Sequence, residues 1–187
     1  MAIKNLERVI LVYAHWKGLQ NPSLMGTLRA SHLRGKEIFS FEYAREWLNS
    51  GYAQLIDPDL QFYAGPQYLR DEKSNFGIFL DSSPDRWGRV LMQRHEAIIA
   101  RTENRKPNSL LETDYLLGVY DEHRMGAIRF KEKEDGPFLN DNREFATPPW
   151  TTLRDLEYAS LQIEKNYNLD NLEYVQLLNM LIAPASS

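Results

Sequence analysis

Cysteine is absent from this sequence. Its absence excludes a disulfide framework, a thiolate zinc site and a cysteine nucleophile together. Long apolar runs are also missing, since no stretch approaches the roughly 18 continuous apolar residues of a membrane-spanning helix. Residues 1–7 lack the basic start and apolar run of a secretory signal. We therefore expect a soluble, cytoplasmic protein with no membrane partner.

The familiar catalytic motifs are missing as well. The sequence has no G-x-x-x-x-G-K-[ST] phosphate loop, no G-x-G-x-x-G, no H-E-x-x-H and no G-x-S-x-G. No two carboxylates stand out as an acid and a base. The histidines have no metal-ligand spacing and are scattered over expected strand edges, loops and one helix: His15, His32, His95 and His123. From the residues alone we predict no catalytic residue and no metal site.

Composition indicates a folded protein with an uneven charge. The chain has 187 residues, of which 43% are hydrophobic and 26% charged, and its formal net charge is −4. A sizeable core is therefore expected. Basic residues outnumber acidic ones in 83–106, whereas acidic residues prevail in 132–173. Such a dipolar chain could dock on an anionic partner, although solvated helix faces explain the same counts.

Hydrophobic periodicity predicts an α+β fold. Residues 9–13, 24–30 and 37–43 read as strands of a small antiparallel sheet, followed by one helical turn at 44–48. Ser82 and Asp85 stand in capping-box spacing, with Pro84 between them, and predict the start of a helix that ends near Arg101. A mostly helical segment with one further β region follows: helices at 113–118, 152–165 and 170–182, and a strand at 125–131.

Four blocks of the sequence together resemble the HipA family, the serine/threonine-protein kinase toxins of bacterial HipA/HipB toxin–antitoxin systems. The first block is the strand at 39–43 with the helical turn at 46–48. The second is Asp81-Ser82-Ser83-Pro84-Asp85-Arg86-Trp87-Gly88-Arg89, followed by Gln93 and Arg94. The third and fourth blocks are residues 114–130 and 181–187. The resemblance covers essentially the whole chain.

The resemblance implies a HipA-like N-terminal subdomain at 1–106 and the beginning of the kinase domain at 107–187. The family's phosphate loop begins where this sequence reaches Ser186 and Ser187, and Ser187 best matches the family's autophosphorylated serine. The resemblance therefore implies a kinase truncated at its phosphate loop, inactive alone, with ATP and Mg²⁺ serving only the intact family member. It also implies as partners a HipB-like antitoxin, the remainder of the kinase core, and DNA only indirectly through the antitoxin.

Two other functions remain open. The chain could be a stand-alone, non-enzymatic inhibitor that binds a separately encoded HipA-like kinase through an exposed aromatic anchor. The candidate interface residues are Trp47, Trp87, Arg86 and Arg89. Alternatively, it could bind nucleic acid through arginines of the 86–101 helix, although these do not form one clean stripe: Arg86, Arg89, Arg94 and Arg101.

Overall fold

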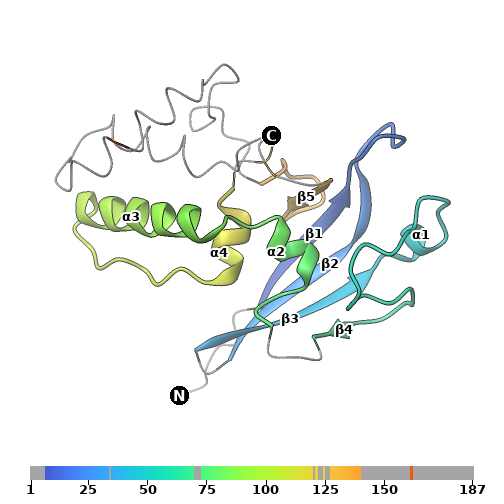
Figure 1. Ribbon diagram of the computed structural model, residues 1–187, viewed down its shortest axis with the longest axis horizontal. Helices are drawn as coiled ribbons and strands as arrows, with labels where there is room; N and C mark the ends of the chain where they lie inside the picture. The colour runs from blue at the N-terminus through green and yellow to red at the C-terminus, as the bar shows by residue number, and fades with distance from the viewer. Residues whose placement is uncertain are drawn as a thin grey trace. The chain divides into compact units, whose positions relative to one another are not determined.

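The computed structural model describes residues 7–33, 35–69, 73–119, 121, 124, 127–139 and 161. It has an α+β fold, as predicted (Figure 1). The elements in chain order are β1 (Glu7–Ala14), β2 (Ser23–Leu33), β3 (Lys36–Tyr43), α1 (Arg45–Leu48), β4 (Gln67–Tyr68), α2 (Gly77–Asp81), α3 (Arg86–Thr102), α4 (Glu112–Leu117) and β5 (Ile128–Lys131). The helices expected at 152–165 and 170–182 lie outside the described residues. No helix in the described ranges is long and apolar enough to cross a membrane.

The five strands form one antiparallel sheet in the order β4-β3-β2-β1-β5 (Figure 1). The period-two alternation explains the first three strands, because Ile10, Val12 and Ala14 of β1 all turn to the buried face. β5 closes the other edge by pairing Phe130 with Val12. The sheet therefore joins the start of the chain to residues more than a hundred positions later.

Aromatic rings fill the core on the buried face of this sheet. The Phe79 ring of α2 lies 5.6 Å from that of Phe41 on β3 and 6.2 Å from that of Phe130 on β5. Phe76 contacts Phe79 edge-on at 6.1 Å. All four phenylalanines are fully buried, and each contributes about 1.5 to 3 kcal/mol by leaving water. This cluster holds α2 against the sheet.

Gly26 on β2 is required by close packing. A Cβ built on it would lie 2.6 Å from the Phe41 ring and would also collide with the backbone oxygen of Glu42. The position lies opposite Val12, where the β1–β2 register shifts. No larger residue fits there while β3 keeps its place.

The start of α3 corrects one sequence prediction. The N-cap is Asp85 and the helix begins at Arg86, so Pro84 precedes the helix instead of occupying its first turn. Ser82 is the C-cap of α2, and its hydroxyl donates to the Ile78 carbonyl at 2.9 Å. The end of α2 and the start of α3 lie within the same few residues, and Ser82 ends α2 instead of starting α3.

The described residues divide into two compact units. Those up to Ser82 together with 127–139 form the first unit, and those from Ser83 through 124 belong to the second. α3 and α4 thus share one unit, although the domain boundary implied by the family resemblance falls between them at 106/107. That family-based division stays a prediction.

Candidate functional site

The start of α3 is held rigidly by its cap. The Asp85 carboxylate accepts the Gly88 N–H at 2.8 Å, and the Asp85 carbonyl accepts the Arg89 N–H at 3.0 Å. Gly88 is buried. Because N-cap bonds of this kind stabilise a helix by about 1 kcal/mol, the first turn is a fixed platform for its side chains.

Arg89, one of the predicted interface residues, is used inside its own unit. Its guanidinium donates to both carboxylate oxygens of Glu112 on α4, at 2.7 and 2.8 Å, and to the Pro84 carbonyl at 3.2 Å. It also lies 4.6 Å above the ring of Tyr115. The hydrogen bond to Glu112 raises the pKa of Arg89. The charge of Arg89 therefore joins α3 to α4 and is neutralised there.

Trp87 and Arg86 lie on the surface of the same helix. Trp87 is 38% exposed, and the guanidinium carbon of Arg94 lies 6.0 Å from the centre of its ring. Arg86 is exposed. The buried face of α3 includes Leu91, which is fully buried. Of the predicted interface residues, Trp87 and Arg86 are the two presented to solvent.

Trp47 is buried, which contradicts the prediction that it is an exposed interface anchor. It is 1% exposed and packs edge-on against Trp16, with ring centres 5.4 Å apart. Its indole N–H has no hydrogen-bond partner in the described part of the chain. Trp47 therefore belongs to the core of the first unit, where a partner could not reach its ring.

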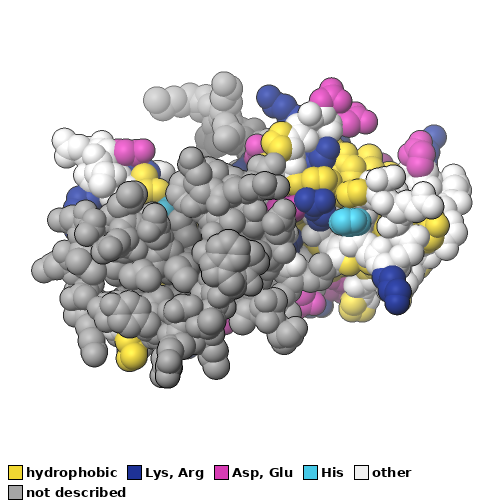
Figure 2. Space-filling view, turned by 90° about the horizontal axis from the view of Figure 1, so that it is seen from above, with side chains coloured by type: hydrophobic (Ala, Val, Ile, Leu, Met, Phe, Trp, Pro, Cys, Tyr) yellow, Lys and Arg dark blue, Asp and Glu magenta, His cyan; other side chains and the backbone are white. Residues whose placement is uncertain are grey.

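A surface that the sequence reasoning missed lies in the loop between α1 and β4. We define the aromatic loop as residues 49–68, which include both residues of β4. Its exposed large apolar side chains are Tyr52 (52%), Leu55 (60%), Phe62 (47%), Tyr63 (48%) and Tyr68 (61%). On the face drawn in Figure 2, yellow apolar groups are interrupted by charged and polar ones. Aromatic residues are enriched in protein interfaces, so this loop is a second candidate surface. The signal in the sequence was the density of Tyr and Phe in a segment without helix or strand period.

Buried polar groups hold the aromatic loop in place. The Asp57 carboxylate, 2% exposed, accepts the N–H of Asp59 and of Ile78, both at 2.8 Å. The Gln67 amide accepts the Gln61 N–H at 2.7 Å and donates to the Gln61 carbonyl at 2.8 Å. These bonds satisfy the loop backbone, so its exposed rings stand on an ordered base.

Two buried ionisable groups of the first unit, Tyr43 and Asp57, are held in fixed protonation or hydrogen-bonding states. Burial, together with the charge of Asp57, raises the pKa of Tyr43 to about 12, so the phenol stays protonated at neutral pH. The Asp57 carboxylate is already committed to backbone N–H groups. Within the described ranges, no group of three or more His, Asp or Glu side chains is placed to hold a metal ion.

Ser186 and Ser187, the predicted remnant of the nucleotide loop, lie outside the described residues. No protein-family model, curated protein or solved structure matches this chain. The described residues thus include two candidate surfaces: Trp87 with Arg86 on α3, and the aromatic loop.

Proposed function

We propose that this chain is the N-terminal portion of a HipA-like serine/threonine-protein kinase and that it acts by binding. In this proposal it packs on the remainder of the kinase core and offers part of the surface that a HipB-like DNA-binding antitoxin grips. DNA is reached only through the antitoxin, and the assembly is cytoplasmic. ATP and Mg²⁺ serve the intact kinase, which phosphorylates a serine or threonine of a protein substrate.

The main support for the proposal is that Trp87, within the block 81–89, is exposed to solvent. This block is part of the resemblance to the family, and it also forms a capped helix start with an exposed indole. The neighbouring Arg89 fixes that helix start through Glu112. A rigid aromatic side chain beside a basic one is a common anchor of protein interfaces, because little conformational entropy is lost on binding.

The aromatic loop supports a second candidate function. Its exposed rings favour a chain that works through docking alone, as a non-enzymatic inhibitor of a separately encoded HipA-like kinase. Both candidates require a complex with a kinase core. In the first candidate function the kinase core needs this chain for activity, whereas in the second the chain inhibits the kinase.

Co-expression with a HipA-like kinase core from the same source cells tests the proposal. We expect a stable complex whose kinase activity depends on the chain. We expect Trp87→Ala to weaken it about 30-fold or more, as for other tryptophan anchors. Lys17→Ala, which alters an exposed residue of the first unit, is the matched control.

The possible outcomes separate the candidates. Kinase activity restored in trans supports the N-terminal portion of a kinase, whereas toxicity relieved in trans supports the inhibitor. The absence of any complex with the core or with a HipB-like antitoxin contradicts both. The mass of the native protein, measured on material from its source cells, shows independently whether the chain continues into a kinase core.

A further inference from the structure

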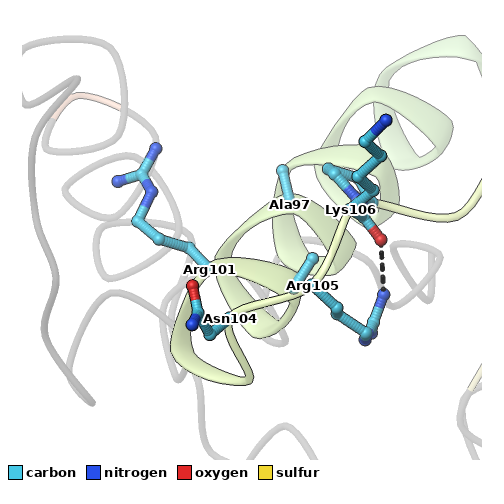
Figure 3. A pocket seen from close by; sticks show the side chains of 7 residues that line it. Ala97, Arg101, Asn104, Arg105 and Lys106 are labelled. Atoms are coloured by element: carbon cyan, nitrogen blue, oxygen red, sulfur yellow. Dashed lines mark hydrogen bonds between the residues drawn. The ribbon is translucent and has the colours of Figure 1, made fainter.

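Two arginines of the second unit have their charges compensated by carboxylates of the chain itself. Arg89 donates to both carboxylate oxygens of Glu112, at 2.7 and 2.8 Å. Arg105 donates to both carboxylate oxygens of Glu96, at 2.6 and 3.2 Å. Figure 3 shows the Arg105 side chain turning toward the Lys106 carbonyl, to which it also donates at 3.2 Å. Both guanidinium groups are therefore committed to internal contacts.

Arg86 differs from these two arginines. Its side chain is exposed, and among the described residues it has no hydrogen bond or ion pair. The carboxylate of the preceding residue, Asp85, accepts the Gly88 N–H at 2.8 Å and serves as the helix cap. An uncompensated guanidinium thus lies in the first turn of α3, next in sequence to the exposed ring of Trp87.

Helix geometry separates these two exposed side chains. Consecutive residues of an α-helix are about 100° apart around its axis, so Arg86 and Trp87 leave α3 in different directions. A single pocket therefore does not hold both groups. A partner that takes the Trp87 ring into an apolar pocket meets the Arg86 cation at the rim of that pocket, where a carboxylate is the matching group.

We infer that the partner surface for this helix start is an apolar pocket with a carboxylate on its rim, and that the kinase core supplies it. The inference rests on the proposed function and specifies the chemistry of the contact. Arg86 pairs with the carboxylate, while the pocket shields the Trp87 ring from water. Because Arg89 is already neutralised, the Arg86 charge is the one that selects the partner and its orientation at this turn.

The compensation of Arg89 and Arg105 disfavours nucleic acid as the occupant of this surface. Proteins bind duplex DNA through several cations, each of which neutralises a phosphate. In the first turn of α3, which the structure describes in full, Arg86 is the cation without a carboxylate partner. One such charge beside an aromatic ring suits a carboxylate on a protein surface better than a row of phosphates.

Calorimetric titration of the full chain with the HipA-like kinase core from the same source cells tests the inference. We expect Arg86→Gln to raise the Kd about threefold to tenfold, because it removes the charge. Arg86→Glu should raise the Kd about tenfold or more, because it places two like charges together. Arg86→Lys, which keeps the charge, should lose less affinity than Arg86→Gln. Added salt should weaken the wild-type complex, and Arg86→Gln should reduce that dependence.

Lys106→Gln is the matched control. Lys106 is an exposed cation of the same unit and follows the other end of α3 (Figure 3). Its substitution should leave the Kd unchanged. Thermal unfolding of each variant shows that it is folded.

The outcomes distinguish this inference from the proposed function. A complex in which Arg86→Glu binds as tightly as Lys106→Gln overturns the inference and leaves the proposed function standing, and so does a complex whose Kd is independent of salt. The absence of any complex overturns both. Saturable binding of a short DNA duplex to the chain alone, weakened by Arg86→Gln, overturns the inference in favour of a nucleic-acid surface.

Discussion

Replacing Arg89 by alanine is the sharpest test of how the second unit is held together. The side chain joins α3 to α4 by two hydrogen bonds with Glu112, at 2.7 and 2.8 Å. Both partners are partly buried, with 27% and 24% of their side chains exposed. The substitution also removes the contact with Tyr115 at 4.6 Å and the bond to the Pro84 carbonyl.

The expected loss of stability follows from these contacts. A partly buried bidentate pair contributes about 1 to 2 kcal/mol, the cation–π contact about 0.5 to 1, and the bond to a neutral carbonyl about 0.5. The free energy of unfolding should therefore fall by about 2 to 3.5 kcal/mol. For a chain of this size, that corresponds to a fall in Tm of about 4 to 14 °C.

Urea and thermal unfolding, followed by circular dichroism, measure the effect. Arg86→Ala is the matched control, because Arg86 is an exposed arginine in the same first turns of α3. It should change stability by no more than about 0.5 kcal/mol. In a double-mutant cycle, Arg89→Ala with Glu112→Gln should show a coupling energy of about 1 kcal/mol or more. Equal stability of the Arg89 and Arg86 variants would refute the role of the pair.

Three further outcomes are expected. Trp47→Ala should lower the free energy of unfolding by about 3 to 5 kcal/mol in urea denaturation, because it empties a fully buried site. Gly26→Ala should cost about 2 to 4 kcal/mol in the same assay, because the new Cβ meets the Phe41 ring. The hydrogen bond from Arg105 lowers the pKa of Glu96 to about 2 from 4.5, so the stability that it adds is present above pH 4.5 and is lost as the pH falls toward 2. Glu96→Gln should therefore flatten the pH dependence of Tm across that interval.

A specific result would contradict each of these three predictions. A Trp47 variant as stable as Trp87→Ala, which alters a partly exposed ring, would mean that Trp47 is not a core residue. A Gly26 variant with unchanged stability would mean that β3 shifts freely. A Glu96 carboxyl carbon that titrates near 4.5 in NMR would mean that Arg105 does not hold it.

Local patterns of the sequence were enough to predict the elements. Period-two alternation at 37–43 predicted β3, and the β-branched apolar run at 9–13 predicted β1. The helix predicted at 113–118 corresponds to α4, which ends at Leu117 with Gly118 as its C-cap. The α+β class followed from the same local signals. The sequence did not predict β4, because a strand of two residues is too short to show a periodic hydrophobic pattern.

The candidate site depended far more on tertiary structure. Trp47 and Trp87 look alike in sequence, each beside a charged residue, yet one is fully buried and the other is 38% exposed. Arg89 resembles Arg86 until α4 brings Glu112 to within 2.7 Å of it. Burial and ion pairing depend on which distant segments meet, and no local period encodes that.

The sequence by itself determined the absence of cysteine chemistry, the positions of the main elements and the fold class. Only the tertiary structure decided which aromatic side chains reach solvent, which arginine is neutralised, and that the Glu96 carboxylate accepts hydrogen bonds from Arg105 and Asn108 after α3. Propensity and capping act over a few neighbouring residues, whereas packing selects among contacts across the whole unit.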